Sequence, residues 1–64
     1  MCEANVYLLD EEGEEKLFLE SVDKIIPNGD ELCLEDIFNH KKYIRARIKE
    51  MELVEHRIVL EKIN

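Results

Sequence analysis

The chain has 64 residues, nine of them basic and sixteen acidic, which gives a formal net charge of −7. A chain of this length forms one small domain, residues 1–64, which buries only about 60% of the surface that its unfolded form exposes. Its two cysteines are too few for a disulfide scaffold, its acidic balance disfavours binding to a phosphate backbone, and no apolar run approaches the ~20 residues of a membrane span. We therefore expect a cytoplasmic protein without a signal peptide or membrane association, whose small core is completed by dimerisation.

The chain begins with Met1-Cys2. If Met1 is removed, Cys2 carries both a free amine and a thiol, which together form a five-membered chelate for a metal ion. A thiolate beside nitrogen donors suits Ni(II), Cu or Zn, and a square-planar nitrogen-rich arrangement favours Ni(II) or Cu(II). If Met1 is retained, the backbone amide of Cys2 can serve beside the thiolate. The simpler alternative is a terminal cysteine without a role, which is the commoner case.

The first predicted element is a strand over about residues 3–10. Val6 and Leu8 alternate there with polar or aromatic neighbours, a period of two that is typical of a strand with one buried face. Residues 10–14 form a predicted turn in which Gly13 can adopt a positive φ.

A second strand follows over about residues 16–26. Leu17 and Leu19 define its apolar face, and the strand is expected to bend near Ser21 before it continues. The sequence Pro-Asn-Gly-Asp at residues 27–30 is the strongest turn signal in the chain.

The third predicted strand begins near Leu32 and Leu34 and ends near Phe38, and a polar turn follows at residues 39–41. In residues 44–48, apolar and basic residues alternate, which predicts a fourth strand. The alternation slips by one residue after this stretch, and we expect a β-bulge near residues 49–50. A turn at residues 55–56 and a last strand at residues 58–60 complete the chain, with a short helical turn in the final third as the alternative.

These elements predict an all-β fold: a small, curled antiparallel sheet or barrel of five or six strands, similar to an SH3 domain. Closure of the sheet removes the exposed strand edges that would otherwise pair with other chains. The predicted core consists of Ala4, Val6, Leu8, Leu17, Leu19, Val22, Ile25, Leu32, Leu34, Ile44, Ile48, Leu53, Ile58 and Leu60.

Other candidate ligands give weaker signals. Cys33 lies between two predicted core leucines, is expected to point outward, and has no CxxC spacing to Cys2 that would indicate a zinc ribbon. His40 and His56 each fall at a predicted turn, where a solvated histidine is commoner than a metal ligand. Glu3 follows Cys2 directly and can act as an outer ligand or hydrogen-bond acceptor.

Four glutamates, Glu11, Glu12, Glu14 and Glu15, could hold a hard cation such as Ca²⁺, but the spacing of an EF-hand loop is absent and a charged hairpin tip is the simpler interpretation. No catalytic motif of the GxSxG, P-loop, GxGxxG or HExxH type occurs. Cys2 as an N-terminal nucleophile would need an oriented base in a cleft, for which so small a domain has little room. We therefore predict that the protein is not an enzyme.

The opening sequence MCEANVYL, residues 1–8, resembles the CooT family of small nickel-binding proteins associated with maturation of carbon monoxide dehydrogenase. The total length and the segments 20–23, 36–38 and 48–60 extend this resemblance over nearly the whole chain. It implies a homodimeric small β-barrel in which Cys2 is the nickel ligand, with carbon monoxide dehydrogenase or its maturation proteins as partners.

The resulting hypothesis is a nickel metallochaperone. A two-fold axis would bring two Cys2 residues together, so that two thiolates and two nitrogens hold one Ni(II) per homodimer. The alternative is a small β-barrel that binds RNA or another protein. Its support is the row of Arg45, Arg47 and Lys49 with residues 41–43 just before it, a pattern that a solvated outer strand explains equally well.

Overall fold

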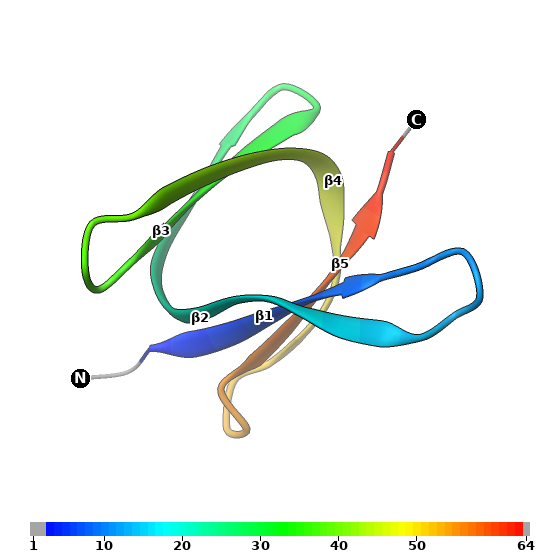
Figure 1. Ribbon diagram of the computed structural model, residues 1–64, viewed down its shortest axis with the longest axis horizontal. Helices are drawn as coiled ribbons and strands as arrows, with labels where there is room; N and C mark the ends of the chain where they lie inside the picture. The colour runs from blue at the N-terminus through cyan, green and yellow to red at the C-terminus, as the bar shows by residue number, and fades with distance from the viewer. Residues whose placement is uncertain (1–2, 64) are drawn as a thin grey trace.

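The computed structural model describes residues 3–63, and within them the chain consists of strands and turns only. Its five strands form one sheet that closes into a barrel in the order of the chain (Figure 1). The predicted all-β barrel is therefore confirmed, with five strands. Residues 3–63 include no helix of the length and hydrophobicity needed to cross a bilayer. The strands are β1 (Ala4–Leu9), β2 (Glu15–Asn28), β3 (Glu31–Asp36), β4 (Lys41–Glu52) and β5 (Arg57–Lys62).

The barrel is closed by a parallel pair. The four pairings of strands consecutive in sequence are antiparallel, whereas β1 and β5 run side by side in the same direction, from Asn5 opposite Arg57 to Leu9 opposite Glu61. An up-and-down meander of five strands has its first and last strands pointing the same way, so its closure has to be parallel. Both strands therefore begin at the same end of the barrel.

Two long strands curve so that each borders two neighbours. β2 bends at Ser21, whose φ is 56°, and pairs with β1 from Glu15 to Val22 and with β3 from Val22 to Asn28. β4 pairs with β3 through its first half and with β5 through its second half. Its register shifts between Ile48 and Glu50, where it pairs with β5. The predicted bend near Ser21 and the predicted bulge at residues 49–50 are both confirmed, and the final third is strand, not helix.

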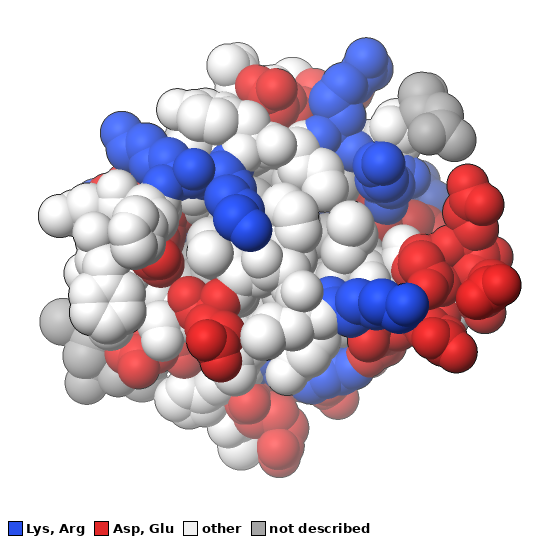
Figure 2. All heavy atoms as spheres, viewed as in Figure 1, with Lys and Arg blue, Asp and Glu red and all other residues white. Residues whose placement is uncertain are grey.

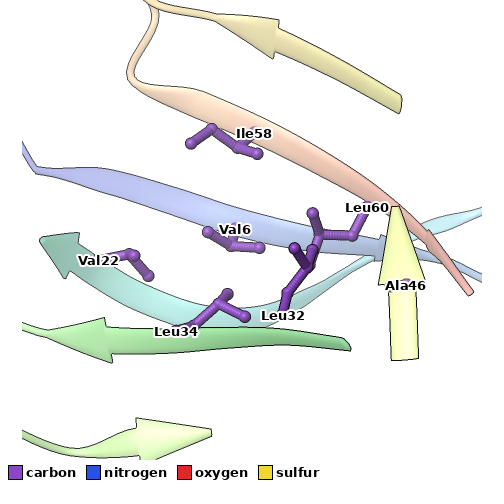
Figure 3. Close-up of a cluster of buried hydrophobic side chains, with 7 residues drawn as sticks. All are labelled: Val6, Val22, Leu32, Leu34, Ala46, Ile58 and Leu60. Atoms are coloured by element: carbon purple, nitrogen blue, oxygen red, sulfur yellow. The ribbon is translucent and has the colours of Figure 1, made fainter. Parts of the chain in front are cut away.

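The core fills the inside of the barrel and receives side chains from every strand (Figure 3). Because side chains alternate across a strand, Leu32 and Leu34 point inward from β3 while Cys33 between them points outward. Leu34 and Leu60 are the largest side chains with no exposed surface. The buried cluster consists of Val6, Val22, Leu32, Leu34, Ala46, Ile58 and Leu60.

Three predicted core residues are exposed instead. Leu17 is 51% exposed because the register of β1 with β2 shifts between Val6 and Tyr7, which turns Leu17 to the outer face beside Tyr7. Ile48 is exposed beside the bulge of β4, and Leu53 is 72% exposed because it lies in the turn after β4.

Two buried hydrophobic residues were missing from the predicted core. Ala46 lies on the inner face of β4, and its small side chain contributes little to the hydrophobic pattern of the sequence. Val59 is buried although its strand neighbours Ile58 and Leu60 belong to the inner cluster. It faces outward between Tyr7 and Glu50 of the adjacent strands.

Candidate functional site

The N-terminal end of β1 lies against the turn between β4 and β5. Cys2 itself lies outside the described residues, so its surroundings are described from Glu3 onward. The amide of Asn5 donates to the carbonyl of His56 at 2.9 Å. A second bond joins Nδ1 of His56 to the carbonyl oxygen of Glu3 at 3.1 Å. The predicted turn residue His56 therefore contacts the residue that follows Cys2, although the two are far apart in sequence.

A shallow hollow of about 310 Å³ opens at this end of the barrel. Ala4, Leu53 and Ile58 give it apolar walls, and Glu3, His56 and Arg57 complete its lining.

Arg57 is already engaged on both sides of its guanidinium group. It forms an ion pair with Glu15 and donates from Nη1 to Glu52 at 2.7 Å. Its guanidinium carbon also lies 5.2 Å from the ring centroid of Tyr7. Because two carboxylates neutralise it, Arg57 places little net positive charge beside the hollow.

Apolar side chains are exposed around the same turn. Val54 is 89% exposed, and Leu53 and Met51 precede it with large exposed surfaces. Exposed apolar groups that gather at one place often mark an interface. Further large apolar side chains are exposed elsewhere on the barrel: Leu17, Ile26, Ile37, Phe38, Tyr43 and Ile48.

The opposite end of β1 carries the acidic turn. Acidic side chains gather over the β1–β2 turn (Figure 2), and carboxylate oxygens of Asp10, Glu12 and Glu14 lie within 4.8 Å of one another. Of the four glutamates considered from sequence, Glu12 and Glu14 belong to this group. Glu15 pairs with Arg57 instead.

The structure gives the acidic turn a local explanation. Oδ1 of Asp10 accepts hydrogen bonds from the amides of Glu12 and Glu14, both at 2.9 Å, and Gly13 has the expected positive φ of 84°. The amide of Glu14, above all, lowers the pKa of the Asp10 carboxyl below its ordinary value. Asp10 therefore organises the turn, a role that the run of glutamates concealed in the sequence.

His40 is held by a buried carboxylate on a different turn. Asp36, at the end of β3, accepts from the amides of Phe38 and His40 at 2.8 and 2.9 Å, and its other oxygen lies 3.0 Å from Nδ1 of His40. Burial raises the pKa of Asp36, but the bonds from His40 and Phe38 outweigh it, so the pKa lies below the ordinary 3.8. His40 thus has a structural partner.

This geometry makes the β3–β4 turn sensitive to acid. Because the folded state lowers the pKa of Asp36, its carboxylate stabilises the fold above the unfolded pKa of 3.8, and that contribution is lost as the pH falls through the lower folded value. We expect Asp36→Asn to destabilise the protein at pH 5. The difference from wild type should shrink as the pH falls below 3.8. Urea unfolding at a series of pH values measures this difference. The exposed Asp23→Asn is the control, and a difference for Asp36→Asn that does not vary with pH would contradict the assignment.

Cys33 and the basic row lie on the outer face of the barrel. Cys33 is a half-buried free thiol between Ile26 and Tyr43 of the neighbouring strands. Arg47 donates twice to one oxygen of Glu61, at 2.9 and 3.1 Å, and Arg45 lies 3.6 Å from Asp30. Carboxylates therefore neutralise part of the row on which the RNA-binding alternative depends.

The fold and the site together define a small β-barrel protein in which Glu3 and His56 line an open hollow at one end of the barrel. The chain belongs to the CooT family: the profile of the CO dehydrogenase accessory protein CooT matches residues 1–61. A crystal structure of a protein assigned as CooT from Carboxydothermus hydrogenoformans is similar, with 49% sequence identity and a TM-score of 0.89. The match covers 98% of this chain and 100% of that one. No curated protein matches this chain. Family membership implies an accessory role for CO dehydrogenase, which fits the predicted non-enzymatic function.

Proposed function

We propose that this protein is a nickel-binding metallochaperone that acts in the cytoplasm as a homodimer. Two Cys2 residues would share one Ni(II), and the protein would assist nickel insertion into carbon monoxide dehydrogenase. The observation that carries this proposal is the Met1-Cys2 start in a chain of the CooT family. The position of Glu3 at the open rim of the barrel supports it, because an acceptor protein could reach a metal held there.

The chemistry of the donors fits nickel. Two thiolates and two nitrogens, either terminal amines or deprotonated amides of Cys2, complete a square-planar set of the kind that Ni(II) favours. Because the thiol and the amine or amide bind the metal only after deprotonation, affinity for nickel should fall as the pH is lowered. The barrel positions the two N-termini and takes no chemical step itself.

The exposed apolar side chains of the β4–β5 turn support dimerisation near the N-terminus. Leu53 lines the hollow beside Glu3, and Val54 follows it with 89% of its surface exposed. An isologous interface at a two-fold axis would cover both copies of this turn at once. It would also supply the extra buried surface that a domain of this size needs.

Native mass spectrometry tests the assembly directly. We expect the wild-type protein to appear as a dimer that holds one nickel when one equivalent of Ni(II) per dimer is added. Val54→Asp places a charge in the proposed interface and should shift the population toward monomers with weaker nickel binding. Ile26→Asp, on the outer face of another strand, is the matched control and should leave the dimer intact.

The same spectra separate the outcomes. A dimer that holds one nickel and is lost only in Val54→Asp would support one Ni(II) per dimer and an interface at the β4–β5 turn. Dissociation in Ile26→Asp alone would move the interface to the outer face of β2 and β3. A wild-type monomer that takes up no nickel would contradict the proposed function, and the family role would then have to rest on another activity.

A further inference from the structure

A second hollow, larger than the one beside Glu3, opens where β1 and β5 end, and its volume is about 480 Å³. This acidic hollow is lined by Leu8, Leu9, Asp10, Glu11, Glu61 and Lys62. We propose that it binds an arginine side chain of a partner protein, with the aliphatic stem of that side chain against the leucines and its guanidinium group at the carboxylates. The inference goes beyond nickel binding, because none of the lining residues belongs to the proposed metal site.

The parallel closure of the barrel forms the acidic hollow. Leu9 lies opposite Glu61 where β1 and β5 run side by side to their ends. Asp10 and Glu11 continue directly from Leu9 into the β1–β2 turn, so the closure brings carboxylates from both ends of the chain to one place. Leu8 and Leu9 are only half-buried, which leaves apolar surface open beside these carboxylates.

Acceptor oxygens remain available at the acidic hollow. Arg47 donates both of its bonds to Oε1 of Glu61, and no bond to Oε2 of Glu61 occurs within residues 3–63. Oδ2 of Asp10 has a distant ion pair with Lys16, at 3.8 Å. The side-chain contacts of the β1–β2 turn do not involve the carboxylate of Glu11 in the part of the chain that the structure describes. Several oxygens can therefore accept from a further donor.

The combination of apolar and anionic surface fits an arginine side chain. Its methylene stem packs along apolar groups while its charged end stays at a polar boundary. The planar guanidinium group offers several donors at once, is less strongly hydrated than an ammonium group, and bonds carboxylates in pairs. The amide of Glu14, above all, lowers the pKa of Asp10, so this carboxylate is ionised at neutral pH and ready to accept.

Negative charge dominates the surroundings of the acidic hollow. Three of its lining residues are acidic, and Lys62 is the basic one. Glu12 and Glu14 add carboxylates from the adjacent turn, where acidic side chains gather in Figure 2, and Lys16 offsets part of this charge. A surface of this kind attracts a basic patch of another protein and orients it during approach. Charge complementarity therefore selects a cationic occupant.

The acidic hollow also lies away from the β4–β5 turn. β1 begins beside that turn, where the amide of Asn5 donates to the carbonyl of His56, and ends at the acidic hollow with Leu9 (Figure 1). A dimer formed through the β4–β5 turn would leave the acidic hollow of each copy accessible. One end of β1 would then serve assembly and the other end recognition of a partner.

A capped peptide, acetyl-Leu-Arg-Leu-amide, is a suitable probe for the wild-type protein. Proton–nitrogen NMR should show shifts of the amides of Leu9, Glu11, Glu61 and Lys62 during titration with this peptide. The same peptide with citrulline in place of arginine keeps the shape of the side chain and loses its charge. We expect it to bind at least ~10-fold more weakly, because hydrogen bonds from a charged donor to a carboxylate are the stronger ones.

Two neighbouring substitutions separate the acidic hollow from a general attraction of the turn. Glu11→Gln and Glu12→Gln each remove a negative charge from an exposed position of the same turn, and only Glu11 lines the acidic hollow. Both variants should fold as wild type does. We expect Glu11→Gln to weaken binding of the arginine peptide by ~10-fold. Glu12→Gln should change it by less than ~2-fold, since only a screened long-range attraction is lost.

Four results would overturn this inference. Equal weakening by Glu11→Gln and Glu12→Gln would reduce the effect to a diffuse attraction of cations. Equal binding of the arginine and citrulline peptides would exclude recognition of the guanidinium group, and shifts confined to other strands would place the peptide elsewhere. Concentration-dependent shifts of the same amides without peptide would assign the acidic hollow to a second copy of this chain. None of these readouts involves nickel, so each leaves the proposed function to its own test.

Discussion

Cys2→Ser should abolish stoichiometric nickel binding while leaving the fold intact. Serine keeps the size of the side chain and the terminal amine but replaces a thiolate with a hydroxyl group, which is not deprotonated at neutral pH and is a poor ligand for a borderline metal. Both halves of a shared site lose their sulfur at once, because a homodimer repeats every substitution. We therefore expect affinity to fall by ~100-fold or more, above the range seen when only a supporting group is removed.

Isothermal titration with Ni(II) measures this loss, and Cys33→Ser is the matched control. Cys33 is a free thiol on the outer face of β3, between Ile26 and Tyr43, so its replacement should leave nickel binding unchanged. Circular dichroism should show the same barrel for both variants, because Cys2 precedes β1 and Cys33 points away from the core. Equal nickel binding by Cys2→Ser and wild type would contradict a thiolate site at the N-terminus.

Leu34→Ala should produce the largest loss of stability. Leu34 has no exposed surface and lies in the cluster that all five strands build. Truncating a buried leucine costs about 3 kcal/mol, through lost transfer free energy and the cavity left behind. A chain of this size is stabilised by only ~3–9 kcal/mol in total. The melting temperature should therefore fall by ~10 °C or more.

Leu17→Ala is the matched control for this substitution. Both leucines belong to the core predicted from sequence, but Leu17 is 51% exposed on the outer face of β2. Its truncation should cost less than about 1 kcal/mol. Urea unfolding of the two variants gives both free energies. Equal losses would mean that Leu17 is buried in solution, against the register described for β1 and β2.

Local patterns predicted most of the fold. Alternating residues located the inner faces of β1, β3 and β5, and Gly13 and Gly29 mark turns where each adopts a positive φ. Leu17, which alternation assigned to the core although its side chain is exposed, shows the limit of such patterns. A register shift with the neighbouring strand reverses the face on which later residues lie, and only the paired strand shows that the shift exists.

The site was less predictable than the fold. Cys2 remains a prediction, because it lies outside the described residues. The contact between His56 and Glu3 joins residues 53 positions apart, and it depends on the parallel closure of β1 against β5. No local periodicity encodes such a contact. His40, which looked equivalent in the sequence, differs only because its turn brings it to Asp36.

The parallel pairing of β1 with β5 also sets the order in which the molecule can be completed during synthesis. β1 finds its second neighbour only after β5 has left the ribosome, so the ring cannot close before that point. Until then, one edge of β1 stays open and the turn that carries His56 is not yet beside Glu3. The contact between His56 and Glu3 therefore becomes available only after β5 has been made.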